Sequence, residues 1–364
     1  MNYFRSWSSK CRHGITIAIL AVFLVCAQLP SEAAKKSEKW LSVPVLYATT
    51  RAPFQNKDGY GGLRNLGKES HGIEYGVVTV SIEDSSTEPD KTAMVKLGWK
   101  PATKKDRKSV QYEKFNDEKF YKELLTRHQS VPKQESCVFV HGYNNSFESA
   151  ARSAARLEVA LKEPVILFSW PSVGKLKAYT IDECNAEWSV RPFQIFMQGL
   201  EKKFDSKNLM TVSHSMGNRL INWYFLSRYD RHQQNPPKFK EVVLTSPDID
   251  RATFKNYFFK VVGNGEKTRI YISDKDVPLR LSNFVHGSSR VGSAISDKEN
   301  KWDLPGNIQN AQTINFSAVD SGNLGHSIQY KVIAGMHEKG EPGDGLKVQE
   351  DQTFKGDYLV VTSH

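Results

Sequence analysis

The sequence predicts an α/β fold in which a mostly parallel central sheet carries helices on both faces. Short apolar runs alternate with longer stretches of helical periodicity over most of the chain. Repeated strand and helix units of this kind imply parallel strands joined by right-handed crossovers. The expected strands of this series are 137–140, 165–170, 209–212, 242–244, 269–272 and 313–316, and the expected helices are 147–161, 188–204, 218–228, 251–259 and a short one near 278–284.

The rest of the chain is less regular, but it contains neither an internal repeat nor a convincing second domain. Residues 285–309, rich in serine, glycine and asparagine, are expected to form a surface excursion that carries part of a substrate pocket. We therefore expect one domain over residues 35–340, followed by a C-terminal tail over 341–364. The elements expected before the regular series are strands at 42–49, 75–82 and 93–97 and a helix at 116–128.

The first 34 residues have the composition of a signal peptide. Arg5, Lys10 and Arg12 precede an apolar run over 15–27 that is too short for a comfortable membrane span. Small residues suit cleavage near residue 27 or near residue 33. The sequence therefore predicts a periplasmic or secreted protein, whereas an uncleaved anchor and lipidation of Cys26 are less favoured readings, the latter because no small residue directly precedes it.

Composition and charge restrict the class of protein further. A chain of 364 residues with 39% hydrophobic residues can bury a substantial core. The formal charge of +10 could indicate an anionic partner, such as an envelope polymer, but most basic residues are dispersed and only 100–108 forms a cluster. Because no nucleic-acid-binding motif is present, we expect a solvated basic face and no nucleic-acid partner. Cys137 and Cys184 could pair in an oxidising compartment, although Cys137 lies in an apolar strand that favours a buried thiol.

The segment 209–221 has the pattern of a nucleophile elbow. An apolar run is followed by Ser213-His214-Ser215-Met216-Gly217 and then by a helical stripe of apolar residues. A serine at the tip of a strand–turn–helix junction has a strained backbone and an exposed hydroxyl, and it requires small neighbours. The pattern predicts Ser215 as a nucleophile, with Ser213 in the position where glycine is more common.

An oxyanion hole is expected where the strand 137–140 ends. The loop His141-Gly142-Tyr143 follows this strand, and the carboxyl ends of parallel strands meet at one edge of the sheet. The backbone amides of Tyr143 and Met216 are the two expected donors to the oxyanion. His141 is more consistent with a structural histidine that bonds to nearby backbone.

An acid and a base follow two later strands. Asp276 is the favoured acid, because it follows the strand two beyond the nucleophile. His326 is the favoured base, and together they give the chain order Ser, Asp, His of α/β hydrolases. Alternatives stay open, since Asp274 and Asp276 could simply cap the next helix, other acids follow the preceding strand, and other histidines are present. These alternative acids and bases are Asp248, Asp250, His286 and His337.

The sequence contains no zinc-protease motif, no paired histidine spacing and no phosphate-binding loop. We therefore expect neither a metal nor another cofactor.

The chain resembles a bacterial family of α/β hydrolases of unknown function that is loosely called esterase/lipase-like. The resemblance extends from about residue 43 to residue 327, and its more specific motifs are FVHGYN at 139–144, FSWPS at 168–172, SHSMG at 213–217, PDID at 247–250 and the segment 273–281. It implies the α/β-hydrolase fold, with Ser215 as nucleophile, His326 as base and Asp276 as the orienting acid. It also suggests a pocket rim formed by Trp170, Pro171, Tyr179, Asp182 and Glu183.

These observations predict an exported serine hydrolase that cleaves a small ester or thioester. An amidase or peptidase would use the same triad. A non-catalytic envelope-binding protein could use the same fold with its basic face. The sequence selects neither the acyl group nor an oligomeric state.

Overall fold

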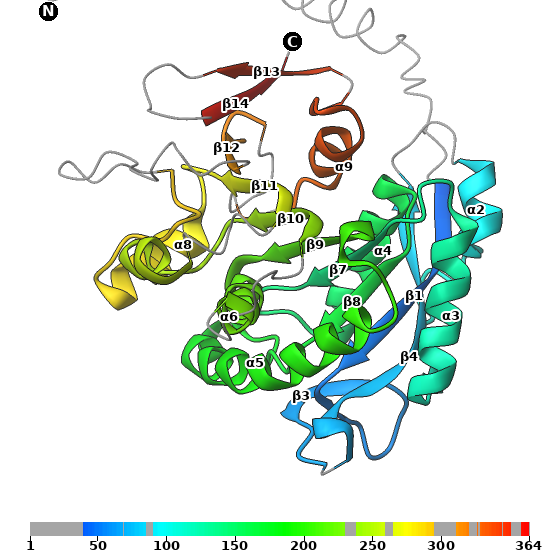
Figure 1. Ribbon diagram of the computed structural model, residues 1–364. Helices are drawn as coiled ribbons and strands as arrows, with labels where there is room; N and C mark the ends of the chain where they lie inside the picture. Colours follow the sequence, from blue (N-terminus) through cyan, green and yellow to red (C-terminus); the bar gives the residue numbers. More distant parts are fainter. Residues whose placement is uncertain are drawn as a thin grey trace, which may run out of the picture. The chain divides into compact units, whose positions relative to one another are not determined.

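In the computed structural model, a central β-sheet organises the unit formed by Lys39–His364 (Figure 1). The described residues are 39–67, 69–84, 90–229, 238–258, 265–294, 311–319, 326, 328–343, 345–350 and 358–363. The predicted signal peptide lies outside them. In the described part of the chain, no helix is both long and apolar enough to cross a membrane.

A twelve-stranded sheet forms the centre of this unit, and its middle part is parallel, as predicted. The parallel strands are β1 (Lys39–Thr49), β7 (Ser136–Val140), β8 (Val165–Ser169), β9 (Leu209–His214), β10 (Phe239–Thr245), β11 (Gly265–Ile272), β12 (Ala311–Asn315) and β14 (Tyr358–Ser363). Antiparallel strands flank them, namely β4 (Glu74–Asp84), β5 (Lys100–Pro101), β6 (Gln111–Phe115) and β13 (Leu346–Glu350). Strands β2 (Arg51–Pro53) and β3 (Tyr60–Arg64) form a separate hairpin.

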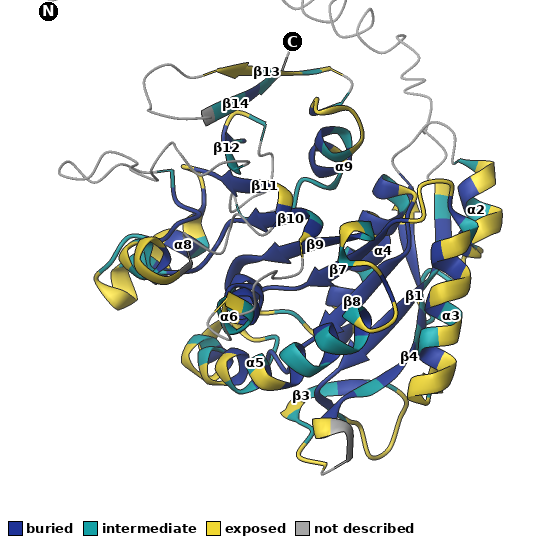
Figure 2. Cartoon of the chain, viewed as in Figure 1, coloured by how far each residue is buried: buried dark blue, intermediate teal, exposed yellow. Residues whose placement is uncertain are grey.

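Helices cover both faces of the sheet, and a buried apolar cluster lies beneath each layer (Figure 2). One face packs against α3 (Asp117–Ser130), α5 (Tyr179–Glu201) and α6 (Asn218–Tyr229). The other packs against α2 (Lys91–Leu97), α4 (Phe147–Leu161) and α9 (Tyr330–Lys339). The central strands are buried on both sides, which explains why their sequences are continuous apolar runs. The remaining helices are α7 (Arg251–Thr253), a π-turn at Phe254–Phe258 and α8 (Val277–His286), and short 3₁₀ turns lie at Glu69–Gly72, Leu176–Ala178, Ser206–Asn208 and Ser215–Gly217.

Two sequence expectations are wrong. The segment 93–97, expected as a strand, belongs to helix α2, because Asp90 caps the amides of Thr92 and Ala93 and Gly98 ends the helix in a left-handed conformation. The predicted domain end at residue 340 is too early, since β14 pairs with β12 and β13 pairs with β14. Both strands are short and lie at the edge of the sheet, where periodicity is weak.

The two cysteines of the described chain are free thiols. Cys137 is buried in β7, whereas Cys184 is exposed on α5. The pairing that the sequence left open is therefore absent between these two residues in this structure.

The chain reverses its direction of winding between β8 and β9. Strand β7 lies between them, and the connection from β7 to β8 runs through α4 on one face, whereas the connection from β8 to β9 runs through α5 on the other. In open parallel sheets, ligands bind at such a switch point, outside the carboxyl ends of the strands. The loops after β7 and β9 meet at this point, and they are the predicted oxyanion loop and elbow.

Candidate active site

Ser215 lies at the end of β9 in the backbone conformation that an elbow requires. Its φ is +52°, a left-handed value that costs a residue other than glycine about 1–3 kcal/mol. The side-chain amide of Asn218 stabilises the turn by donating to the carbonyls of Ser215 and Thr245, at 2.9 and 3.2 Å. Buried hydrogen bonds therefore stabilise the strained backbone of Ser215 close to its hydroxyl group.

Glycine is required both in this turn, at Gly217, and in the neighbouring loop after β7, at Gly142. A Cβ at Gly217 would lie 2.4 Å from the carbonyl oxygen of His141, and a Cβ at Gly142 would lie 2.8 Å from the Cβ of Ser215. Ser213, in contrast, fits in the first position of the motif because its hydroxyl donates to Asn218 Oδ1 at 2.7 Å. The departure from glycine there is compatible with an intact elbow.

Asp276 and His326 are in direct contact. His326 Nδ1 lies 2.6 Å from Asp276 Oδ2, although 50 residues separate them in the sequence. Asp276 also caps α8, since its Oδ1 accepts the amide of Leu279 at 2.9 Å. The sequence presented helix capping and pairing with a histidine as alternatives, but the two oxygens of this buried carboxylate make both contacts. Because a carboxylate only accepts, His326 Nδ1 carries the proton and Nε2 is left without one.

His214, which directly precedes Ser215, contacts the imidazole of His326 and so places this imidazole near the serine. Its ring packs against the ring of His326, with centroids 4.6 Å apart. Burial, with a further contribution from His326, lowers the pKa of His214 well below its ordinary value, so this ring stays neutral. Among the described residues no hydrogen bond joins Ser215 to His326. Such bonds are often long without substrate.

The expected oxyanion donors face no competing acceptor. Within the described residues, neither the Tyr143 amide nor the Met216 amide donates a hydrogen bond. His141 has the structural role expected for it: Nδ1 lies 2.8 Å from the Gly142 carbonyl, and the ring stacks on Trp170. Burial, with a smaller effect of Arg51, lowers the pKa of His141 to about 3.

Arg51 is the main site residue that sequence analysis missed. Its guanidinium is fully buried and donates to the carbonyls of Gly61, Ser172 and Asn145 and to Ser169 Oγ, at 2.7–3.1 Å. It also lies 3.3 Å from His141 Nε2. Burial lowers its pKa to about 9. Arg51 therefore connects the predicted oxyanion loop to the segment after β8. The signal in the sequence is its position two residues after the end of the first strand.

The alternative acids and bases have other partners. Asp274 is exposed, and Asp250 caps α7 through the amide of Thr253. His286 contacts Glu183 Oε1 at 2.9 Å rather than Asp276. His337 lies at the opposite edge of the sheet, where it contacts Glu241 at the amino-terminal part of β10.

The predicted pocket rim needs correction. Trp170 and Asp182 are fully buried, and their polar atoms have partners inside the protein. The Trp170 ring N–H donates to the His141 carbonyl, and Asp182 accepts from Ser172 Oγ and the Val173 amide. Pro171 is also buried. Of the residues suggested for the rim, Tyr179 and Glu183 are the partly exposed ones.

Asp248, one of the alternative acids, is the centre of a buried polar network. It accepts from Tyr179 and Ser282 at 2.5 and 2.7 Å and lies 3.3 Å from the Arg290 guanidinium. Burial by itself raises the pKa of Asp248, but the guanidiniums of Arg219 and Arg290 outweigh it and lower the pKa below its ordinary value. The carboxylate is charged in the folded protein because these cations surround it.

We expect Asp248→Asn to reduce the free energy of unfolding at pH 7 by about 3 kcal/mol, since it removes the carboxylate beside the buried guanidinium of Arg290. An aspartate with a lowered folded pKa stabilises the protein above its unfolded pKa of about 3.9, and this contribution disappears as the pH falls through the folded value. Urea unfolding of both proteins between pH 7 and 3.5 should show the difference narrowing at the acid end. Asp205→Asn, at an exposed helix cap, is the control. A pH-independent difference would contradict the charge argument.

A strained serine on a strand–turn–helix junction and a carboxylate–imidazole pair at one edge of a mostly parallel sheet define the α/β-hydrolase class. The chain belongs to the family described as "Alpha/beta hydrolase of unknown function (DUF900)", whose model matches residues 116–333. The family resemblance expected from the sequence motifs is thereby confirmed.

Solved structures of esterases are among its structural neighbours, all at low similarity. An esterase/lipase from an uncultured bacterium is 14% identical and covers 50% of this chain and 56% of its own, with a TM-score of 0.28. Carboxyl esterase 2 from the mycorrhizal fungus Tuber melanosporum is 13% identical, with coverages of 68% and 69% and a TM-score of 0.31. The chain thus spans little more than half of the first of these proteins. No curated protein matches the chain.

Proposed function

We propose that this protein is a serine hydrolase that cleaves ester or thioester bonds with Ser215, His326 and Asp276. The observation that carries the proposal is the coincidence of a strained Ser215, at φ +52°, with a 2.6 Å contact between His326 and a buried Asp276. A serine hydroxyl is a weak nucleophile without an adjacent base, and the base needs an orienting carboxylate. Each of these groups has a candidate at this edge of the sheet.

In the proposed reaction, Ser215 Oγ attacks the acyl carbonyl while His326 Nε2 takes the hydroxyl proton. The imidazolium then donates this proton to the leaving alkoxide or thiolate, and Asp276 stabilises its charge through Nδ1. The amides of Tyr143 and Met216 stabilise the negative charge on the carbonyl oxygen. Water repeats the sequence on the acyl enzyme, with His326 again as the base, and regenerates Ser215.

The surface next to Asp276 supports an acyl substrate with an apolar chain. Helix α8, which begins directly after Asp276, exposes Val277, Leu281, Phe284 and Val285. Their spacing puts most of these side chains on one face of the helix. We therefore propose that the acyl group contacts α8 and that longer acyl chains are cleaved more efficiently than acetate.

The test is labelling with a fluorophosphonate probe, followed by hydrolysis of a chain-length series of activated esters and a matched amide. The wild type should be labelled at Ser215, and Ser215→Ala should lose both labelling and at least about 10⁴-fold in kcat. Ser227→Ala, on the helix that follows the elbow, is the matched control. Equal labelling of wild type and Ser215→Ala would refute the nucleophile, and faster cleavage of the amide would refute the ester assignment.

We also propose that the protein is exported and that its amino-terminal segment is removed. The support is the basic, then apolar, then small-residue pattern of residues 1–34. Mass spectrometry of the protein isolated from a bacterial envelope should find a mature amino terminus near residue 28 or residue 35. An intact residue 1 in that fraction would contradict removal.

A further inference from the structure

A second cluster of titratable side chains lies at the opposite edge of the sheet from Ser215. Glu135 directly precedes β7, Glu163 precedes β8 by two residues, and His337 comes from α9. One ligand atom from each of the three lies within 4.8 Å of the others. Because β7 and β8 are parallel, the two glutamates lie at the amino ends of the strands, away from the proposed catalytic residues.

Two of these side chains are deeply buried, and each has a polar atom without a hydrogen-bond partner. The side chains of His337 and Glu163 are each only 4% exposed. Neither His337 Nε2 nor Glu163 Oε2 has a hydrogen-bond partner, although buried polar atoms are normally paired. Nε2 faces the carboxylates, at 3.3 Å from Glu135 Oε2 and 3.6 Å from Glu163 Oε1.

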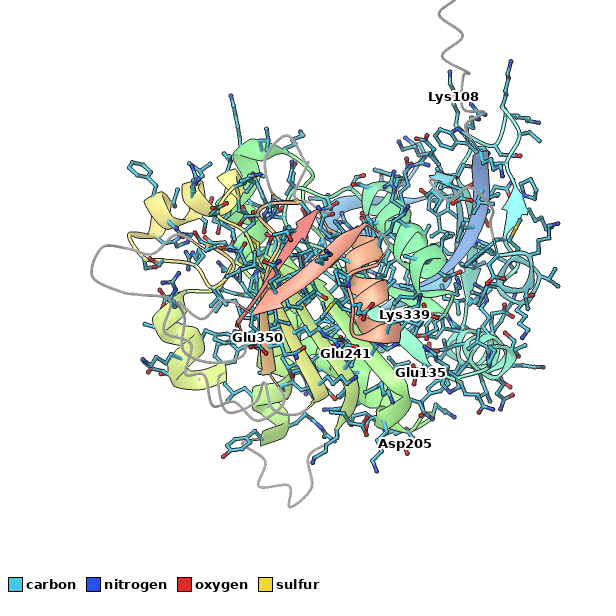
Figure 3. All side chains as sticks on the ribbon, turned by 90° about the horizontal axis from the view of Figure 1, so that it is seen from above. Lys108, Glu135, Asp205, Glu241, Lys339 and Glu350 are labelled. Carbon is cyan, nitrogen blue, oxygen red and sulfur yellow. The ribbon has the colours of Figure 1, made fainter. Side chains whose placement is uncertain are left out.

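The other nitrogen of His337 is oriented in the way that metal-binding histidines are. Nδ1 lies 2.6 Å from Glu241 Oε2, and Arg269 contacts the second oxygen of Glu241. In protein metal sites, a carboxylate commonly accepts the second imidazole N–H and so directs the first nitrogen at the ion. Glu241 lies beside Glu135 near the end of α9 at Lys339 (Figure 3).

We propose that Glu135, Glu163 and His337 bind a zinc ion, with water as the fourth ligand. Ligand bonds of about 2.05 Å in a tetrahedron put neighbouring ligand atoms about 3.3 Å apart. The two distances from His337 Nε2 are close to this value. An imidazole nitrogen with two carboxylates suits zinc better than calcium or magnesium, which prefer oxygen ligands.

Charge and access are compatible with the ion. When His337 is in the neutral form that binds a metal, the three carboxylates exceed the one buried guanidinium, that of Arg269, by two charges, which a divalent cation would neutralise. Lys133 and Lys240 lie 3.6 Å from Glu163 and Glu135, respectively, and both are about half exposed, so they can turn to solvent when an ion binds. Glu163 and Lys133 also line a cavity of about 190 Å³, which provides a path of entry.

The site joins segments that are far apart in the sequence. Glu135 and Glu163 are 28 residues apart, and His337 comes 174 residues later, so no short metal motif results. The expectation of no metal came from the absence of short metal-binding motifs, and such motifs cannot reveal ligands that are this far apart in the sequence. The ion would connect α9 to the strands beneath it and would stabilise the fold rather than take part in hydrolysis.

The experiment is zinc titration of the full chain after dialysis against a chelator, measured by calorimetry and by thermal unfolding. We expect one equivalent of zinc to bind and to raise the Tm by several degrees. Cobalt, used as a spectroscopic substitute, should give visible absorption of a tetrahedral site. Preferred binding of calcium or magnesium over zinc, or no binding to the wild type, would overturn the proposal.

Zinc affinities of variants can distinguish direct binding of the ion by a side chain from a general effect of removing a negative charge. Glu163→Gln should lower the zinc affinity at least tenfold, and Glu241→Gln should lower it about 10 to 100-fold by releasing the imidazole. Glu338→Gln, an exposed neighbour of His337 that lines the same cavity, should bind zinc like the wild type. The wild-type titration decides the matter if Glu163→Gln does not fold. Equal loss in Glu338→Gln and Glu163→Gln would contradict ligation by Glu163.

Discussion

Replacing Asp276 with asparagine is expected to lower kcat for ester hydrolysis about 10⁴-fold while the protein stays folded. The amide can still accept the Leu279 N–H and cap α8, because asparagine is as good a helix cap as aspartate. It cannot, however, balance the charge of the His326 imidazolium. If its NH₂ group turns toward His326, Nδ1 must become an acceptor, and the proton moves to the nitrogen that should act as the base. Steady-state kinetics and thermal unfolding of the same preparation measure both effects.

Two comparisons make the Asp276 prediction specific. Asp276→Ala should lose the same activity and also about 1 kcal/mol of stability, since it removes the cap. Asp250→Asn is the matched control, because Asp250 caps α7 through Thr253 in the same way but lies outside the proposed triad. If Asp276→Asn lowered kcat no more than Asp250→Asn, Asp276 would be a helix cap and the orienting acid would have to be sought elsewhere.

The parallel core of the fold could be predicted because its strands are buried on both faces. Strands such as β7 and β8 are continuous apolar runs, and long periodic helices such as α4 separate them. The edges could not be predicted in the same way. Strand β13 alternates half-exposed residues, and the helical state of 91–97 depends on caps at Asp90 and Gly98 that are single residues rather than a pattern. Local chemistry of this kind carries little periodic signal.

In the candidate site, too, some residues could be predicted from the sequence and others could not. The sequence indicated the residues that follow strands, such as Ser215 and Asp276, because topology alone brings the ends of parallel strands together. It could not indicate partners that depend on side-chain packing. Trp170 and Asp182 were expected at the rim, but their polar atoms satisfy buried backbone groups instead. A side chain with a polar atom is compatible with either role until its neighbours are known.

Arg51 is the residue whose replacement we expect to damage stability and activity together. In Arg51→Lys, a single ammonium with three donors must replace a planar fork that contacts three carbonyls, Ser169 and His141. Buried carbonyls would lose their donors, and we expect the free energy of unfolding to fall by about 3 kcal/mol. The effect on activity follows from the geometry, because Arg51 contacts the Asn145 carbonyl and His141, which flank the predicted oxyanion donor Tyr143.

Loosening this loop should lower kcat about 100-fold, which is the usual effect of losing one oxyanion donor, with little change in KM. Arg64→Lys is the matched control, since Arg64 lies on the neighbouring hairpin strand and, among the described residues, its side chain donates a hydrogen bond to Asn185 and lies over the Trp188 ring, away from the oxyanion loop. Urea unfolding and ester kinetics on the same samples separate the two effects. If Arg51→Lys lost stability but kept its kcat, the arginine would hold the fold without positioning the oxyanion loop. A fall in kcat at temperatures where the variant is fully folded is therefore the decisive observation, because it would show that catalysis depends on the contacts by which Arg51 joins the loop between β7 and α4 to the segment after β8.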